Sequence, residues 1–171
     1  MDLLTAVDAL CGIRRIGWLQ RGVQDAESVC QHSVLAALLA GEIAAKLSGL
    51  GIAVDPAYAV AAALLHDLPE AELGHPSNGV REGVDWAKLE EEAFKHLYPH
   101  LYDLFSQYRR RSTDLGLLVS FADKLATLIR ACAYRRRGYP TDDLIEAFKK
   151  RLGEYPDPYP ELLEEYVKKY C

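Results

Sequence analysis

Apolar side chains recur every three to four positions along almost the whole chain, and no stretch alternates between apolar and polar residues for long enough to suggest a convincing strand. This periodicity predicts an all-α protein. Glycines, prolines and capping residues divide the pattern into about six or seven helices. We expect them at residues 3–11, from Asp25 or Ser28 to about 47, at 56–66, 85–110 with a break at Pro99, 114–137, 141–152 and about 162–170.

Proline-containing segments mark several expected boundaries. Pro69 lacks an N–H and would clash with the carbonyl of Leu65, so the helix before it should end or kink there. Residues 74–83 are expected to form a loop, and the PDPYP motif at 156–160 a rigid connector. With no internal repeat or low-complexity linker, we expect a single domain over residues 1–171, in which 156–171 form a Pro-rich connector and C-terminal helix.

The composition narrows the class of protein. Of the 171 residues, 50% are apolar and 26% are charged, which is enough to bury a core. The formal net charge of −5 argues against a general nucleic-acid binder. No window approaches the roughly 18 consecutive apolar residues of a membrane span, and the N-terminus is acidic where a secretion signal would be basic. We therefore expect a cytoplasmic protein with no membrane or nucleic-acid partner.

Four cysteines are spread along the chain, at Cys11, Cys30, Cys132 and Cys171. They form no CxxC pair and show no disulfide-like spacing. We therefore predict that they are buried or free thiols.

His32 lies on the apolar face of the second expected helix. It follows Val29 by three residues and precedes Ala36 by four, so its side chain should point inward. Such a residue is either a core histidine bonded to a backbone carbonyl or a ligand.

His66 and Asp67 follow AVAAALL, one of the most apolar runs in the chain. Neighbouring helical residues point about 100° apart, so both can reach one ion only near a helix end, which Pro69 would supply. The alternative is a surface aspartate beside a helix-terminal histidine.

Asp123 lies at the edge of the buried face of its helix, in LLVSFADKLATLIRA. A salt bridge to a neighbouring Lys or Arg would explain Asp123 alone. Together with His32, His66 and Asp67, however, separate explanations require three independent coincidences, whereas one shared cation explains them all. Two imidazoles and two carboxylates suit a divalent transition metal such as Mn, Co, Fe, Zn or Ni.

Glu70 is a candidate proton-handling group. It follows Asp67 by three residues and His66 by four, and shares their face if the helix continues past Pro69. A carboxylate beside a metal-bound water can take its proton or give one to a leaving group. His75, in the following loop, could reach the same place. The alternative for Glu70 is a solvated residue in the acidic run PEAE.

Arg15, Trp18 and Arg21 lie in a loop that leads directly to His32. A guanidinium binds phosphate in a planar, two-pronged way, and an indole can stack on a base or sugar. This loop is therefore a candidate substrate-binding segment. The alternative is a solvated loop whose tryptophan anchors the core.

These motifs in their order resemble the HD-domain metal-dependent phosphohydrolases, and more closely their 5′-deoxynucleotidase branch. The family pattern is an arginine before Gly-Trp, Glu-Ser-Val ahead of the first histidine, HDxxE, and Asp-Lys-Leu. Here the matching residues are Arg15, Gly17-Trp18, Glu27-Ser28-Val29, His32, His66-Asp67-Glu70 and Asp123-Lys124-Leu125. The HD pair alone is unspecific, but the full ordered set is strong.

The resemblance implies a helical HD-domain bundle that hydrolyses deoxyribonucleoside 5′-monophosphates, small-molecule substrates, with one divalent metal. Arg15 would bind the phosphate, Trp18 would crowd the sugar 2′ position and exclude ribonucleotides, and Glu70 would handle the proton. The implied metal ligands are His32, His66, Asp67 and Asp123. Family members are often dimers, so a homodimer is possible, with the C-terminal helix as a partner surface or docked on its own core.

One departure from the family concerns His75. The family usually has Asp after the glycine that follows HDxxE, where it is thought to help orient the attacking water, but here Gly74 is followed by His75. Histidine can act as acid or base, yet its charge and reach differ. Two alternatives therefore stay open: the same machinery acting on a triphosphate, cyclic or signalling nucleotide, and a nucleotide-binding protein that has lost the reaction.

Overall fold

The computed structural model describes residues 1–171, apart from the side chain of Asn78. The described backbone contains helices and irregular segments without a strand, so the predicted all-α class is confirmed. The helices are α1 (Leu3–Gly12), α2 (Ile16–Leu19), α3 (Val29–Gly49), α4 (Pro56–Leu65), α5 (Glu70–Leu73), α6 (Asn78–Glu82), α7 (Trp86–Leu97), the 3₁₀ helix η1 (Pro99–Leu101), α8 (Tyr102–Arg109), α9 (Asp114–Arg136), α10 (Asp142–Gly153) and α11 (Tyr159–Tyr170).

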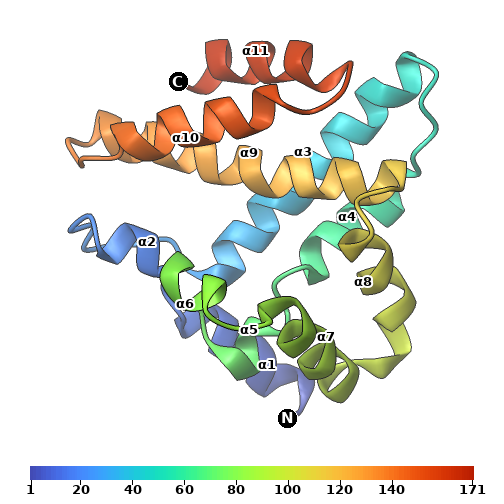
Figure 1. Ribbon diagram of the computed structural model, residues 1–171, viewed down its shortest axis with the longest axis vertical. Coiled ribbons are helices and arrows are strands. Elements are labelled where there is room, and N and C mark those ends of the chain that lie inside the picture. Colours follow the sequence, from blue (N-terminus) through green and yellow to red (C-terminus); the bar gives the residue numbers. More distant parts are fainter.

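The two longest helices, α3 and α9, cross at the centre of the molecule (Figure 1). Helix α4 packs along α3, while α10 and α11 cover α9 at the top of this view. Helices α1, α2 and α5 to α8 lie below α9 in Figure 1. Among the described helices, none combines the length and the apolar character of a membrane span.

Helices α3 and α4 approach each other closely because small residues face one another. A Cβ atom on Gly41 would lie 2.8 Å from Cγ2 of Val60, so the contact requires glycine there or a shift of the valine. The chain reverses between the two helices, and this packing therefore brings the start of α3 beside the end of α4 (Figure 1). The fully buried alanines of the two helices are Ala36, Ala40, Ala44, Ala59, Ala62 and Ala63.

Capping residues set the predicted helix starts. Oγ of Ser28 accepts from the backbone N–H of Gln31, and Oε1 of Gln31 accepts from the backbone N–H of Ser28, so this pair forms a capping box at the start of α3. Asp55 caps α4 and Asp85 caps α7. The long helices therefore begin within a few residues of the expected positions.

Three short helices were not expected from the sequence. Helix α2 lies in the loop that carries Arg15 and Trp18, α5 follows Pro69, and α6 occupies part of residues 74–83, so the prediction of a loop over that whole segment is wrong. All three are too short for a repeated apolar period, so a pattern search cannot detect them.

The C-terminal helix docks on its own chain. Leu162, Leu163 and Tyr166 of α11 are buried where the helix meets α9 and α10. At its end Cys171 forms a disulfide with Cys132 of α9. The prediction of four thiols is therefore wrong for this pair: the docking of α11 brings together two cysteines 39 residues apart, which local spacing does not reveal. Cys11 and Cys30 are free.

Candidate metal centre and adjoining pocket

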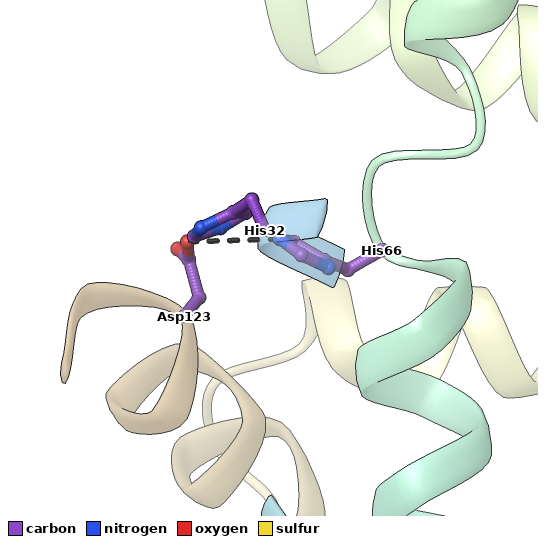
Figure 2. Close-up of side chains that lie close together, drawn as sticks. All are labelled: His32, His66 and Asp123. Atoms are coloured by element: carbon purple, nitrogen blue, oxygen red, sulfur yellow. Dashed lines mark hydrogen bonds and ion pairs between the residues drawn. The ribbon is translucent and has the colours of Figure 1, made fainter. Parts of the chain in front are cut away.

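Four side chains singled out in the sequence lie together at the junction of α3, α4 and α9. His32 comes from the first turn of α3, His66 from the C-cap of α4, Asp67 from the turn that follows, and Asp123 from the middle of α9. Figure 2 shows His32, His66 and Asp123 pointing toward one another. One ligand atom from each of these three lies within 4.8 Å of the others.

The end of α4 lets His66 and Asp67 face the same point. The helix stops at Leu65, and a turn over residues 66–69 leads into α5, for which Pro69 is the N-cap. The backbone hydrogen bonds of this turn span three residues, as from Leu68 N–H to the carbonyl of Leu65, and Nε2 of His66 lies 3.1 Å from Oδ2 of Asp67. The four residues thus share one small space despite the angular separation of helical neighbours.

The separations within this four-residue cluster suit a single ion. Nε2 of His32 lies 3.0 Å from Oδ1 of Asp123 and 3.8 Å from Oδ2 of Asp67. Nε2 of His66 lies 3.6 Å from Oδ1 of Asp123. Ligand atoms about 2.0–2.2 Å from one metal are separated from each other by about 3–3.5 Å in common geometries. The cluster is therefore close to the size of a coordination sphere.

His66 supplies an independent sign that the cluster fits a cation. Its Nδ1–H donates to the carbonyl of Ala63 at 2.6 Å, so Nε2 is the ring nitrogen that faces the carboxylates. In the neutral ring, Nε2 is buried and has no hydrogen-bond donor among the described residues. A buried polar atom without a partner is costly, so this site takes up either a proton or, in its place, a metal ion.

His32 is held from both sides. Nη1 of Arg15 donates to its Nδ1, and Nε2–H then donates to Oδ1 of Asp123. For Nε2 to bind a metal, that proton has to leave, as metal binding to histidine generally requires. Arg15 also donates to Oγ1 of Thr127 at 3.2 Å, which ties the arginine to α9.

The two carboxylates control the charge of the cluster. Burial alone would lower the pKa of His66, but Asp67 and Asp123 outweigh burial and raise that pKa well above its usual range. Burial opposes the ionisation of both aspartates, yet the neighbouring histidines hold their pKa values below the usual range. Burial and Arg15 lower the pKa of His32. The four side chains thus carry more negative than positive charge, which favours a cation.

A cavity of about 350 Å³ adjoins the cluster. Arg15 links the two, because it lines the cavity and also contacts His32. Trp18 borders the cavity although only 2% of its surface is exposed. Arg21 lies on the same wall, with its guanidinium paired to Asp143 of α10. The cavity is lined by Arg15, Ile16, Gly17, Trp18, Gln20, Arg21, His75, Pro76, Ser77, Gly79, Thr127, Leu144 and Phe148.

Glu70 and His75 form a pair beside this cavity. Nδ1 of His75 lies 2.7 Å from Oε2 of Glu70, and Arg81 pairs with Oε1. Glu70 is fully buried and does not line the cavity, whereas His75 does. The expectation that His75 could reach the same place as Glu70 therefore agrees with the geometry, but only the imidazole borders the space open to a substrate.

Comparison with known proteins assigns the family. A model of the HD domain matches residues 29–128, more than half of the chain and all four residues of the cluster. The chain belongs to the HD-domain family. The resemblance seen in the sequence, and with it the class of metal-dependent phosphohydrolase, is confirmed.

The HD domain described here has relatives along nearly its whole length. It is 26% identical over 168 residues to the 5′-deoxynucleotidase HDDC2 of Danio rerio, covering 92% of this chain and 80% of that protein, and 25% identical to the human protein of the same name, covering 92% and 79%. A conserved hypothetical protein from Pyrococcus furiosus has a TM-score of 0.89 at 30% identity, covering 97% of this chain and 98% of the other. The PH0347 protein from Pyrococcus horikoshii has a TM-score of 0.83 at 30% identity, covering 97% and 92%.

Three residues of the HD-domain site were not assigned a role from the sequence. Thr127 bonds to Arg15, Arg81 pairs with Glu70, and Glu27 contacts both Trp18 and Arg15. Glu27 was noted only as part of the family motif. Arg81 and Thr127 carried no local signal, because their partners come from other elements of the fold.

Proposed function

We propose that this HD domain hydrolyses deoxyribonucleoside 5′-monophosphates to a deoxynucleoside and phosphate. One observation carries the proposal: Arg15 joins a cluster of four candidate metal ligands to a cavity large enough for a small ligand. The relatives named 5′-deoxynucleotidase, which match over 92% of this chain, support the choice of substrate.

His32, His66, Asp67 and Asp123 would hold one divalent transition metal, of which Mn, Co, Fe, Zn and Ni are candidates. Bound there, the ion supplies Lewis-acid chemistry, neutralising phosphate oxygens and making water a better nucleophile. Two features of the protein support such an ion. In the neutral ring, the buried Nε2 of His66 has no donor among the described residues, and Asp67 and Asp123 raise the pKa of His66, so the cluster attracts positive charge.

Arg15 would bind the phosphate. Its contacts with His32, Thr127 and Glu27 all use Nη1, so within the described contacts its other N–H groups are free for phosphate oxygens. Arg21 would add a second positive charge from the opposite end of the same loop, in a position steadied by Asp143.

Trp18 would discriminate between sugars. Its indole is almost completely buried yet borders the cavity, so it forms a rigid wall that cannot swing away easily. A wall of this kind beside the sugar leaves room for a 2′-hydrogen and excludes a 2′-hydroxyl by steric contact.

His75 and Glu70 would handle the proton. As the bond from phosphorus to the 5′-oxygen breaks, that oxygen needs a proton, and His75 borders the cavity where the oxygen would lie. Glu70 accepts from Nδ1–H and so directs the other ring nitrogen away from itself. Arg81 pairs with the second oxygen of Glu70, so both oxygens of this side chain are engaged.

Phosphate release from a panel of substrates tests the proposal. The metal-stripped protein is reloaded with Mn²⁺, Co²⁺, Fe²⁺, Zn²⁺ or Ni²⁺ and given dAMP, the other deoxynucleoside monophosphates, AMP, dATP, a cyclic nucleotide and a signalling nucleotide. We expect metal-dependent release from the deoxynucleoside monophosphates and much less from AMP.

Other outcomes of this panel would replace the proposal. Faster turnover of dATP or of a cyclic or signalling nucleotide would assign the same machinery to that substrate. Saturable binding of dAMP without phosphate release under any of the metals would make the protein a nucleotide-binding module. Release of equal amounts from dAMP and AMP would remove the role given to Trp18.

A further inference from the structure

Glu27 is a buried acidic side chain that contacts two residues lining the cavity, and the proposed reaction gives it no task. It lies just before the capping box of α3, and its side chain is fully buried. Oε2 accepts from Nε1–H of Trp18 at 3.2 Å, and Oε1 accepts from Nε–H of Arg130 at 2.9 Å. Nη1 of Arg15 lies 3.7 Å from Oε2. One carboxylate therefore contacts two of the three proposed substrate-binding residues, Trp18 and Arg15.

The backbone of Glu27 strengthens this arrangement. Its carbonyl accepts from the backbone N–H of Arg15 at 3.1 Å, and its own N–H donates to the hydroxyl of Tyr134 at 2.7 Å. The ring of Tyr134 in turn meets the indole of Trp18 edge-on, with 5.1 Å between ring centroids. Because Arg130 and Tyr134 both belong to α9, Glu27 anchors the substrate-binding loop to the helix that carries Asp123.

We propose that Glu27 is a positioning residue that sets the preference for the deoxyribose sugar. The fully buried carboxylate accepts a charge-assisted hydrogen bond from Trp18, which holds the indole against the cavity. Its ion pair with Arg15, at 3.7 Å, keeps the guanidinium beside His32. An indole held in this way excludes a 2′-hydroxyl. An indole without this hydrogen bond can move aside and admit a ribose sugar. The kinetic test of this inference rests on the proposed function, because it measures hydrolysis of dAMP and AMP. The spectroscopic test of Trp18 does not rest on it.

The chain contains a matched control for Glu27. Like Glu27, Glu90 is buried and pairs with a tryptophan and with arginine: Trp86 donates to it at 2.7 Å and Arg109 lies 2.7 Å away. Glu90 does not line the cavity described above. Replacing either glutamate by glutamine removes one negative charge from a Glu–Trp–Arg cluster, but only one of the two clusters borders the substrate.

The test compares Glu27→Gln with Glu90→Gln by measuring kcat and KM for dAMP and for AMP. In Glu27→Gln we expect KM for dAMP to rise by about tenfold or more, with a smaller change in kcat, and the preference for dAMP over AMP to fall by at least about tenfold. Glu90→Gln should keep the parent preference. Glu27→Asp keeps the charge but is one methylene shorter, and should give an intermediate preference.

A spectroscopic readout separates this inference from the proposed function. Trp18 and Trp86 are the two tryptophans of the sequence, so a Trp86→Phe background reports on Trp18 alone. In that background Glu27→Gln should shift the tryptophan emission and Glu90→Gln should not. If the parent protein hydrolyses neither dAMP nor AMP, the proposed function fails and this shift alone decides whether Glu27 positions Trp18.

Three results would overturn the inference. The first is an unchanged dAMP preference in folded Glu27→Gln, or in Glu27→Asp if the glutamine variant does not fold. The second is an equal loss of preference in Glu90→Gln, which would indicate general loosening of the fold. The third is Trp18 emission that Glu27→Gln leaves unchanged.

Discussion

His75 reaches the cavity while Glu70, only 2.7 Å away from its Nδ1, is completely buried behind it. The carboxylate already contacts Arg81 and His75 with its two oxygens, so it is not free to meet a substrate directly. The family usually places an aspartate where this chain has His75. A histidine backed by a carboxylate is a suitable proton donor, since the carboxylate fixes which ring nitrogen faces outward.

Replacing His75 should lower kcat most for substrates whose leaving group must be protonated as it departs. A positioned general acid contributes roughly 100-fold to 10,000-fold. We expect His75→Asn to lower kcat for dAMP by about 100-fold or more, but to affect 2,4-dinitrophenyl phosphate little, because dinitrophenolate leaves without protonation. Steady-state kinetics on both substrates measure the difference.

His96 provides the control for this experiment. It is exposed and its Nδ1 lies 3.0 Å from Oε1 of Glu72, so it is also a His–Glu pair but lies away from the cavity. His96→Asn should leave both rates unchanged. Equal losses on dAMP and on the dinitrophenyl ester in His75→Asn would contradict a role as proton donor.

Replacing Asp67 should remove the metal without unfolding the helices. Asp67 lies 3.1 Å from Nε2 of His66 and 3.8 Å from Nε2 of His32, in a turn outside α4. After dialysis, Asp67→Ala should retain at least tenfold less metal than the parent, with loss of dAMP hydrolysis and an unchanged far-ultraviolet circular dichroism spectrum. Asp103→Asn, an exposed change on α8, is the control. Parent-like hydrolysis by Asp67→Ala in metal-free buffer would rule out the mechanism.

The long helices and the cluster could be predicted because their signals are local. The period of α3 places His32 on the buried side, and a capping residue marks its start at Ser28. His66 and Asp67 follow an apolar run that ends near Pro69. A polar group on such a face is costly without a partner, so these residues predict a shared site when they are taken together, although each alone has another explanation.

The partners of the buried glutamates could not be predicted in the same way. Glu27 and Arg130 are 103 residues apart, and Glu70 and Arg81 are 11 residues apart across an irregular segment. Local spacing marks Glu70 and the family motif marks Glu27, but nothing in the sequence near either glutamate shows which arginine it pairs with. These contacts depend on how α9 and the 74–83 segment fold onto the site, which is a property of the packing and not of any one helix.

The affinity for metal should rise with pH because of His66. The neighbouring carboxylates raise its pKa well above the ordinary value of about 6.5, so in the metal-free protein a proton occupies the cluster at neutral pH. A metal must displace that proton, and its apparent Kd should fall by up to about tenfold per pH unit below the raised pKa. Titration calorimetry with Mn²⁺ in buffers of different ionisation enthalpy measures both the affinity and the proton release.

The same raised pKa predicts how stability changes with pH. The interaction of protonated His66 with the carboxylates stabilises the folded metal-free protein, and this contribution is complete below the pKa of His66 in the unfolded chain, about 6.5. The contribution is lost as pH rises through the pKa of His66 in the folded protein. The difference in melting temperature between the metal-loaded and metal-free forms should therefore widen from pH 6 to pH 8. A difference that narrows over this range would contradict the assignment of His66 as a ligand.

Reduction of the Cys132–Cys171 disulfide should destabilise the protein. The bond ties the end of α11 to α9 and closes a loop between residues 39 positions apart, so in the unfolded state it restricts the chain considerably. We expect Cys171→Ser to lower the free energy of unfolding by about 2–4 kcal/mol, measured by denaturant titration. Parent protein in reductant should behave like Cys171→Ser, and Cys11→Ser, which alters an exposed free thiol, should match the oxidised parent. If reductant left the parent's unfolding midpoint unchanged, the disulfide would not be what holds α11 in place, and the burial of Leu162, Leu163 and Tyr166 would be sufficient.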